Sequence, residues 1–234
     1  MTGGERVKKI KFRHEFKHYI NLTECVVLQS KLHTVMKHDD HVGPNGIYLI
    51  RSLYFDTPDD KALMEKITGL KRHEKFRIRL YNHNETYIKL EKKVKTGDIA
   101  SKRGASITKE QCEKILAGNI EWLKDSEKPL LEELYEKMQH QQLRPKTIVD
   151  YIREPYVFSA GNVRVTLDKQ LKTGLYSIDL FNKELLTVDV LDPNLIILEV
   201  KYDAFLPEVI SDILQLGDRR KTSISKYAIC RKYE

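Results

Sequence analysis

Charged side chains recur at every second position in several segments of the sequence, which is the spacing that places them together on one face of a β-strand. In one segment Arg77 and Arg79 alternate with Phe76, Ile78 and Leu80. The same spacing recurs at Arg13, Glu15 and Lys17, at Lys89, Glu91 and Lys93, at Arg164, Thr166 and Asp168, and at Glu199 and Lys201. Five strands are therefore each expected to carry a charged row.

Two interpretations fit these rows. The simpler one is that they face water while the apolar rows form the core, as in a half-solvated antiparallel sheet. The residue types favour the other, because the rows are weighted to Arg and Lys with a sparse carboxylate in nearly each. If the sheet closes with helices packed outside it, the charged rows line its lumen. Many cations facing one another repel, so such a lumen requires a polyanion or metal-bridged carboxylates.

The elements that must position these rows can be read from β-branched and aromatic runs and from helix caps. Strands are predicted near residues 10–20, 46–55, 74–82, 85–94, 98–107, 146–158, 161–168, 184–191 and 195–202. Helices are predicted from Glu24 to Lys37 with Thr23 as N-cap, from Thr57-Pro58 onward, after the capping box Thr108 to Gln111, from Pro129 to Gln141 and from Pro207 to Leu216. We therefore expect an α+β fold, an antiparallel β-barrel tunnel with peripheral helices, since so many strands curl to avoid open edges.

Composition limits the remaining choices. The 234 residues carry 41 Lys+Arg against 34 Asp+Glu, a net charge of +7, and 41% hydrophobic residues, enough for a core. No linker or repeat divides them, so residues 1–234 are expected to form a single domain. No apolar stretch approaches the ~20 residues of a membrane span, and no secretory signal is visible. Cys25, Cys112 and Cys230 form no CxxC motif, which fits a reducing cytoplasm.

Seven short segments, in order, carry a resemblance to a known family. They are Arg13-His14-Glu15-Phe16-Lys17, Ser52-Leu53-Tyr54-Phe55-Asp56, Arg77-Ile78-Arg79-Leu80-Tyr81, Leu90-Glu91-Lys92-Lys93, Val163-Arg164-Val165-Thr166-Leu167-Asp168, Leu198-Glu199-Val200-Lys201 and Ser225-Lys226-Tyr227. From about residue 8 to residue 231 the chain resembles the VTC domain, the polyphosphate-polymerase branch of the triphosphate tunnel metalloenzymes. The resemblance implies an antiparallel β tunnel lined by basic residues and a few metal-binding carboxylates.

The resemblance also implies roles for individual residues. The residues expected to act in phosphoryl transfer are Lys17, Arg77, Arg79, Lys93 and Lys226, and those expected to bind phosphates are Lys89, Lys102, Arg153, Arg164 and Lys201. Arg donates two hydrogen bonds to phosphate oxygens, while Lys supplies a compact charge. Glu199 matches the principal metal ligand, Glu91 is expected to assist it, and Glu15 is either a further ligand or a partner of a neighbouring cation. The implied cofactor is Mn²⁺ or Mg²⁺, and the implied substrates are ATP and inorganic polyphosphate.

Departures from the family pattern refine this hypothesis. Hydrolases of the superfamily carry Glu-x-Glu-x-Lys in the first strand, and Arg13 stands at the first of these positions, which favours the polymerase branch. The fungal polymerase has a second lysine where this chain has Ser223, with Lys221 two residues earlier. The fungal proteins' sensor domain and transmembrane segment are not present here, so direct membrane insertion is not expected, and a membrane-protein partner stays open.

Three functions remain open at this point. The first is a polyphosphate polymerase that transfers the γ-phosphoryl group of ATP to a growing chain. A triphosphatase or polyphosphatase would use the same phosphate clamp with water as acceptor, and a non-catalytic module would bind polyphosphate alone. A nucleic-acid partner is not expected, because the lysines of residues 89–103 alternate as strand residues do.

Side chains outside the rows receive simpler predictions. His14 and His18 are expected on the outer face of the tunnel, and His38-Asp39-Asp40-His41 is expected to be a solvated loop rather than a metal site. Ser52 and Tyr54 lie on the face opposite Leu53, so they either approach the lumen or form structural hydrogen bonds.

Overall fold

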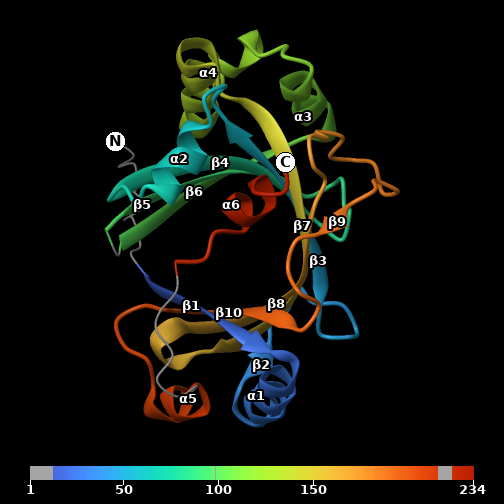
Figure 1. Ribbon diagram of the computed structural model, residues 1–234. Helices are drawn as coiled ribbons and strands as arrows, with labels where there is room; N and C mark the ends of the chain where they lie inside the picture. The colour runs from blue at the N-terminus through green and yellow to red at the C-terminus, as the bar shows by residue number, and fades with distance from the viewer. Residues whose placement is uncertain (1–12, 98, 216–222) are drawn as a thin grey trace, which may run out of the picture.

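Ten strands form one antiparallel sheet in the computed structural model, which describes residues 13–97, 99–215 and 223–234 (Figure 1). The strands are β1 (His14–Asn21), β2 (Lys37–His38), β3 (Tyr48–Asp56), β4 (Arg72–Tyr81), β5 (Ile88–Thr96), β6 (Ile99–Ile107), β7 (Arg144–Phe158), β8 (Val163–Thr173), β9 (Val188–Asp189) and β10 (Leu195–Tyr202). Their order is β1-β10-β8-β7-β3-β4-β5-β6, with β2 paired to β7 and β9 to β8.

The sheet curls until its two edge strands approach each other. A β-bridge joins Arg13, next to β1, to Ala100 of β6, although these strands stand at opposite ends of the strand order. Figure 1 shows the consequence: β4, β5 and β6 lie above, β1, β10 and β8 lie below, and the long strands β3 and β7 connect them. The predicted α+β fold with a curled antiparallel tunnel is confirmed.

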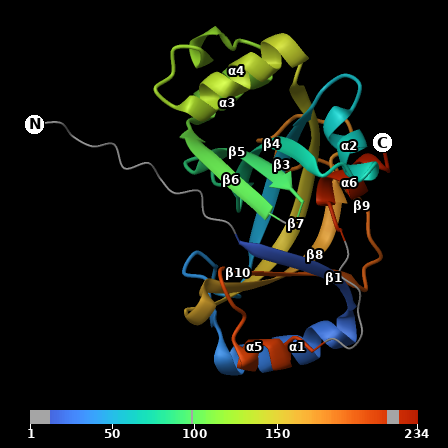
Figure 2. The same cartoon turned by 90° about the vertical axis from the view of Figure 1, so that its left-hand side faces the viewer.

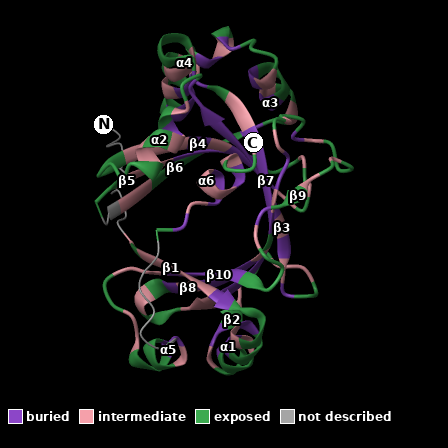
Figure 3. Ribbon diagram, viewed as in Figure 1, coloured by how far each residue is buried: buried purple, intermediate pink, exposed green. Residues whose placement is uncertain are grey.

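Helices cover the outer faces of the curled sheet (Figure 2). Helices α1 (Leu22–Val35) and α5 (Glu208–Ile213) pack outside β8 and β10, where Leu28 and Leu32 meet Val165 and Leu198. Helices α3 (Lys109–Leu116) and α4 (Pro129–Gln141) cover β3, β4 and β5 in the same way. Figure 3 shows buried residues along the strands and exposed ones on the outer sides of these helices. The apolar rows thus face helices, which leaves the alternate rows facing inward.

The last helix, α6 (Lys226–Arg231), lies inside the curl rather than outside it (Figure 1). The Tyr227 ring stacks on Tyr54 of β3 with 5.1 Å between centroids, and its hydroxyl donates to Asp56 at 2.5 Å. Because Asp56 is the last residue of β3, α6 occupies the end of the tunnel where β3 finishes and β4 (Arg72–Tyr81) starts.

Two predicted helix starts are wrong for a shared reason. In each, the side chain of the last residue of the preceding strand accepts hydrogen bonds from N–H groups in the first turn of the helix. Helix α1 starts at Leu22 rather than Glu24, because Asn21, not Thr23, accepts from the Glu24 N–H while Glu24 accepts from the Asn21 N–H. This helix ends at Val35, before the predicted end at Lys37, which lies in β2.

Helix α2 (Lys61–Ile67) starts after the predicted Thr57-Pro58. The buried carboxylate of Asp56 accepts hydrogen bonds from the N–H groups of Thr57, Ala62 and Leu63, which holds the intervening turn outside the helix. The capping box of α3 at Thr108 and the start of α4 at Pro129 are confirmed.

Two other elements are shorter than predicted. Only Val188–Asp189 of the expected strand 184–191 pairs in the sheet. Helix α5 covers Glu208–Ile213, and the predicted end at Leu216 lies outside the described residues, as do Lys221 and residues 10–12 of the first predicted strand. Within the described ranges, no helix has both the length and the apolar character needed to cross a membrane.

Candidate functional site

The charged rows of the strands converge inside the curl. Lys93 of β5 binds Glu15 of β1 at 2.8 Å. These two strands are not neighbours, because β6 lies between them and contacts the start of β1 through the Arg13–Ala100 bridge. Lys226 reaches the interior from α6 and binds Asp168 of β8 at 2.5 Å. Ion pairs between strands that are not neighbours require the rows to face one another. The rows therefore line a lumen, and they are not the solvated face of an open sheet.

The first cluster in the lumen joins β1 and β10 to β5. Glu15 binds Lys17 at 3.2 Å and Lys201 at 3.9 Å, and Glu199 binds the same two lysines at 3.5 and 3.0 Å. The two carboxylates thus lie close together and share two cations, and Glu15 also binds Lys93. Of the predicted metal ligands, Glu15 and Glu199 are brought together.

The second cluster is centred on the buried carboxylate of Asp168. The Arg153 Nε and Nη2 atoms donate to its two oxygens at 2.6 and 2.7 Å, and Nη2 also lies 3.2 Å from Glu199. Lys226 adds its ammonium group at 2.5 Å. Asp168 therefore orients one predicted phosphate-binding residue, Arg153, and one residue predicted to act in phosphoryl transfer, Lys226, and Arg153 connects it to Glu199.

The third cluster surrounds Glu91. Its carboxylate binds Arg77 at 2.7 Å, Arg79 at 4.0 Å and the ammonium group of Lys102. Within the described ranges, none of these three cations also binds Glu15 or Glu199. Glu91 thus stands apart from the other two predicted metal ligands.

Hydroxyl groups fix the two arginines of β4. The Arg77 Nη1 atom donates to the Tyr54 hydroxyl at 2.9 Å, and Arg79 donates to Ser52 at 3.1 Å and to Tyr151 at 3.0 Å. The two alternatives for Ser52 and Tyr54 thus coincide, because their hydroxyls form structural hydrogen bonds with arginines of the lumen. Burial raises the pKa of Tyr54, but Arg77 and Arg79 outweigh it, so the pKa lies below its usual range.

The four lumen carboxylates are ionised at neutral pH. Burial and Glu199 raise the pKa of Glu15, but Lys17, Lys201 and Lys93 outweigh both and bring it to about 2. Burial likewise raises the pKa of Asp168, and Arg153 and Lys226 lower it to about 2. Burial raises the pKa of Glu91 and of Glu199, and the neighbouring cations hold both well below the usual range.

In several lumen lysines, burial outweighs the nearby carboxylates and lowers the pKa. Burial and then Lys17 lower the pKa of Lys93 to about 8, although Glu15 counteracts them. Burial also lowers the pKa of Lys102 to about 8 despite Glu91. Burial, with Lys66 and Lys17 nearby, lowers the pKa of Lys75 to about 7. The cations that line the tunnel, among them Lys17, Lys75, Arg77, Arg79, Lys93, Lys102, Arg153, Lys201 and Lys226, outnumber its four carboxylates, which favours an added polyanion.

Two predicted phosphate-binding residues lie at the end of the tunnel opposite α6. Arg164 donates to the Tyr48 hydroxyl at 2.7 Å and binds Asp39 at 2.9 Å. The Lys89 ammonium lies 4.6 Å from the centre of the Tyr87 ring.

Sequence reasoning missed Lys75 and gave Asp168 no functional role. Lys75 donates to the Ser225 hydroxyl at 3.0 Å, and its place two residues before Arg77 was a signal for the same row. Asp168 carried a similar signal beside Arg164 and Thr166. The contacts that define their roles come from α6, whose position inside the curl has no such sequence signal.

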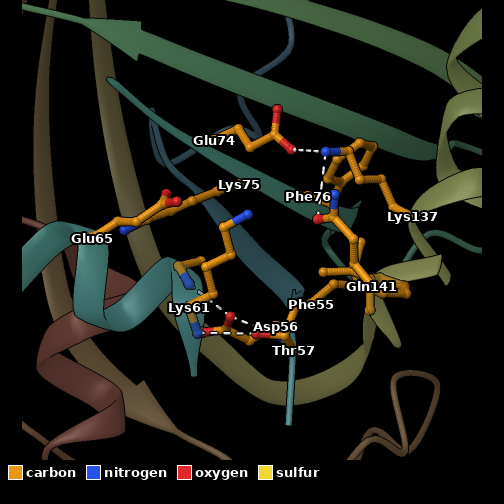
Figure 4. Close-up of a pocket in the computed structure, with 12 residues that line it drawn as sticks. Phe55, Asp56, Thr57, Lys61, Glu65, Glu74, Lys75, Phe76, Lys137 and Gln141 are labelled. Atoms are coloured by element: carbon orange, nitrogen blue, oxygen red, sulfur yellow. Dashed lines mark hydrogen bonds and ion pairs between the residues drawn. The ribbon is translucent and has the colours of Figure 1, made fainter. Parts of the chain in front are cut away.

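A pocket between α2, β4 and α4 lies beside the tunnel (Figure 4). Three of its charged groups have local partners, since Lys137 binds Glu74 at 2.7 Å and Asp56 accepts backbone hydrogen bonds. These pairs make the pocket a weaker candidate for anion binding than the tunnel.

Outside the tunnel, one group of three His, Cys, Asp or Glu residues within the described ranges is close enough to hold a metal ion. It comprises His33, His38 and Glu154, and Glu154 already accepts hydrogen bonds from Gln29 and Lys169, each at 2.7 Å. Further along the same outer face, His14 stacks on Tyr202 at 5.0 Å.

Comparison with known proteins agrees with this geometry. The family model of the VTC domain matches residues 12–233. The chain belongs to the VTC domain family. This VTC domain is built on a curled antiparallel sheet. No curated protein matches the sequence significantly.

Two solved structures share the fold of this VTC domain. One is a proposed adenylate cyclase from Bacillus halodurans, with 14% identity, coverage of 92% of this chain and 94% of that chain, and a TM-score of 0.54. The other is HpAC1 from Hippeastrum, a proposed adenylyl cyclase described as having a dominant triphosphatase activity. It shows 14% identity, coverage of 96% of this chain and 97% of that chain, and a TM-score of 0.52. Identities this low support the shared fold and nothing finer.

Proposed function

We propose that this VTC domain is a polyphosphate polymerase, which transfers the γ-phosphoryl group of ATP to the end of a polyphosphate chain lying in the tunnel. The observation that carries the proposal is the convergence of basic rows from several strands on one lumen whose positive charge exceeds that of its carboxylates. An extended polyanion fits this arrangement, because each phosphate along its length meets cations from more than one strand.

The arginines would bind phosphates with little rearrangement. Arg77 and Arg79 are oriented by Glu91, Ser52 and the hydroxyls of Tyr54 and Tyr151, as described above. Fixed donors aimed at developing charge lower a barrier without reorganising during the reaction. Lys17, Lys93, Lys102 and Lys226 would add compact charges along the chain, and Lys89, Arg153, Arg164 and Lys201 would extend the clamp toward its ends.

The carboxylates fit a divalent metal ion. Glu15 and Glu199 are ionised oxygen donors that lie close together in the lumen, and Mg²⁺ is often held by one or two carboxylates together with substrate phosphates. Glu199 and Glu15 would hold Mn²⁺ or Mg²⁺, and Glu91 would assist only after release from Arg77 and Lys102. When bound, the ion would neutralise charge on the phosphate oxygens.

The reaction needs positioning and charge stabilisation rather than covalent chemistry from the protein. A terminal oxygen of the polyphosphate chain attacks the γ-phosphorus, and the bond to the bridging oxygen breaks, so that ADP leaves with that electron pair. The Arg77 and Arg79 guanidinium groups would stabilise the transferred phosphoryl group, and Lys17 and Lys93 would stabilise the charge on the two flanking phosphates.

A triphosphatase is the second candidate. HpAC1, which shares the fold, is described as having a dominant triphosphatase activity. The same clamp would serve that reaction with water as acceptor. The position of Arg13 supports the polymerase, because it binds Asp203 at 2.9 Å where hydrolases of the superfamily carry a glutamate.

Substitutions in the tunnel test the proposal. Arg77→Ala and Glu199→Gln should each reduce ATP-dependent polyphosphate synthesis by at least about 100-fold, the range seen when a transition-state donor is removed. The matched control is Arg103→Ala, because Arg103 lies on the opposite face of β6 from Lys102 and binds Glu133 of α4. Circular dichroism should show that all three variants are folded. Full activity of either tunnel variant would contradict the proposed site.

A further inference from the structure

A ladder of tyrosines lies at the end of the tunnel opposite α6. Tyr48 starts β3, Tyr81 ends β4 and Tyr87 immediately precedes β5. The Tyr48 and Tyr81 ring centroids are 5.5 Å apart, and those of Tyr81 and Tyr87 are 6.0 Å apart. The ladder runs outward, because Tyr48 is buried, Tyr81 is half-buried and the Tyr87 side chain is 43% exposed.

The ladder adjoins the phosphate clamp. Tyr81 and Tyr87 have the sequence parity of Arg79 and Lys89, so they continue the charged rows of β4 and β5 toward this mouth. The Arg79 guanidinium lies 5.9 Å from the centre of the Tyr81 ring. A molecule that extends out of the clamp at this end therefore reaches aromatic rings first.

Lys89 stands at the junction between the clamp and the ladder. Its ammonium group lies 4.6 Å from the centre of the Tyr87 ring, and no carboxylate is within ion-pair distance among the residues that the structure describes. A cation without a carboxylate partner, next to an exposed aromatic ring, matches a ligand whose phosphate and flat ring are joined by a short linker.

The other end of the tunnel is less suited to a bulky group. Tyr227 of α6 stacks on Tyr54 there, and Lys75 donates to Ser225. The described segment from Ser223 through α6 thus occupies that end, while the Tyr87 ring remains exposed at this one.

We propose that Tyr81 and Tyr87 form the nucleobase subsite of the tunnel, and that Lys89 binds the phosphate nearest the ribose. This inference rests on the proposed function only in taking a nucleoside triphosphate as the donor. The base would stack on the exposed Tyr87 ring. Because every base has a π-face, such stacking tolerates different bases, and ATP and GTP should bind with similar affinity.

Comparison of two ligands tests the subsite. Tyr87→Ala should weaken ATP binding by about 5- to 100-fold, the range reported for loss of one base–aromatic stack. Binding of inorganic tripolyphosphate, which has no base, should change by less than about 2-fold. Tyr87→Phe should keep most of the ATP affinity that Tyr87→Ala loses, because it retains the ring for stacking and removes only the hydroxyl that hydrogen-bonds Lys89. Tyr233→Ala, which removes another exposed tyrosine, is the control.

Equal losses for both ligands, or no loss for either, would overturn the subsite. Tyr87→Leu gives a second test that keeps an apolar side chain should the alanine variant unfold, and it should show the same selective loss. Equilibrium calorimetry reads these affinities without turnover. A selective loss for ATP in a protein that makes no polyphosphate would therefore support the subsite and refute the polymerase. Polyphosphate synthesis without a selective loss for ATP would support the polymerase and refute the subsite.

Discussion

Asp168→Asn should destabilise the protein strongly although it changes one atom. The carboxylate is 2% exposed and accepts from Arg153 at 2.6 and 2.7 Å and from Lys226 at 2.5 Å. The amide keeps the shape but removes the charge, and it leaves two buried cations with a neutral partner. Removing one partner of a buried ion pair costs about 3–5 kcal/mol.

The depressed pKa of Asp168 gives a second and lower value for the free energy that its carboxylate contributes to stability. Asp168 titrates near pH 2 instead of at 3.8, a difference of nearly two units. At about 1.36 kcal/mol per unit, the ionised form contributes about 2–3 kcal/mol to stability. Because the folded-state pKa is depressed, this contribution is fully present above pH 3.8 and is lost as the pH falls toward 2. We therefore expect Asp168→Asn to lower the free energy of unfolding by about 3–5 kcal/mol at pH 7.

Urea denaturation measures this loss. The difference between the original protein and Asp168→Asn should be largest at neutral pH and should shrink between about pH 4 and pH 2. Asp179→Asn, which changes an exposed aspartate in a loop, should alter stability by less than about 0.5 kcal/mol. A loss below about 1 kcal/mol for Asp168→Asn at pH 7 would refute the assignment of Asp168 as the anchor of Arg153 and Lys226.

Two predictions concern the charge of the lumen. Tripolyphosphate affinity should fall as the pH rises from about 6 to about 9, because Lys75, Lys93 and Lys102 lose protons near pH 7, 8 and 8. Calorimetry at several pH values measures this, and a flat profile would contradict it. Tripolyphosphate at one hundred times its Kd should stabilise the fold by about 2.7 kcal/mol, or about 5–10 °C in Tm. A thermal melt without any shift would argue against binding in the tunnel.

Period-two spacing made the inner rows predictable from sequence. It placed Arg77, Arg79, Glu91 and Glu199 on one face of their strands, where Arg77 and Arg79 pair with Glu91 and Arg153 pairs with Glu199. Spacing along one strand cannot show which rows touch across a lumen, because that depends on how far the sheet curls. The Lys93–Glu15 pair is an example, since it spans strands that are not neighbours.

Local hydrogen bonding explains most of the incorrect element boundaries. Thr23 has a suitable side chain for capping, but Asn21 accepts the Glu24 N–H instead. Thr57 accepts only the Lys61 N–H, while Asp56 accepts those of Ala62 and Leu63. Both competitors lie at the last residue of a strand, so the strand end determines where the next helix starts. The tyrosine ladder was also not predictable from spacing, because Tyr48 and Tyr81 belong to different strands and Tyr87 precedes a third.

The fate of the ATP γ-phosphate tests the central proposal most directly. The protein would be incubated with γ-labelled ATP and Mn²⁺ or Mg²⁺, and the products separated by gel electrophoresis and by extraction of free phosphate. The proposed polymerase predicts that most of the label enters long-chain polyphosphate and that Arg77→Ala loses this product. Recovery of the label as free phosphate alone would contradict it and favour the triphosphatase.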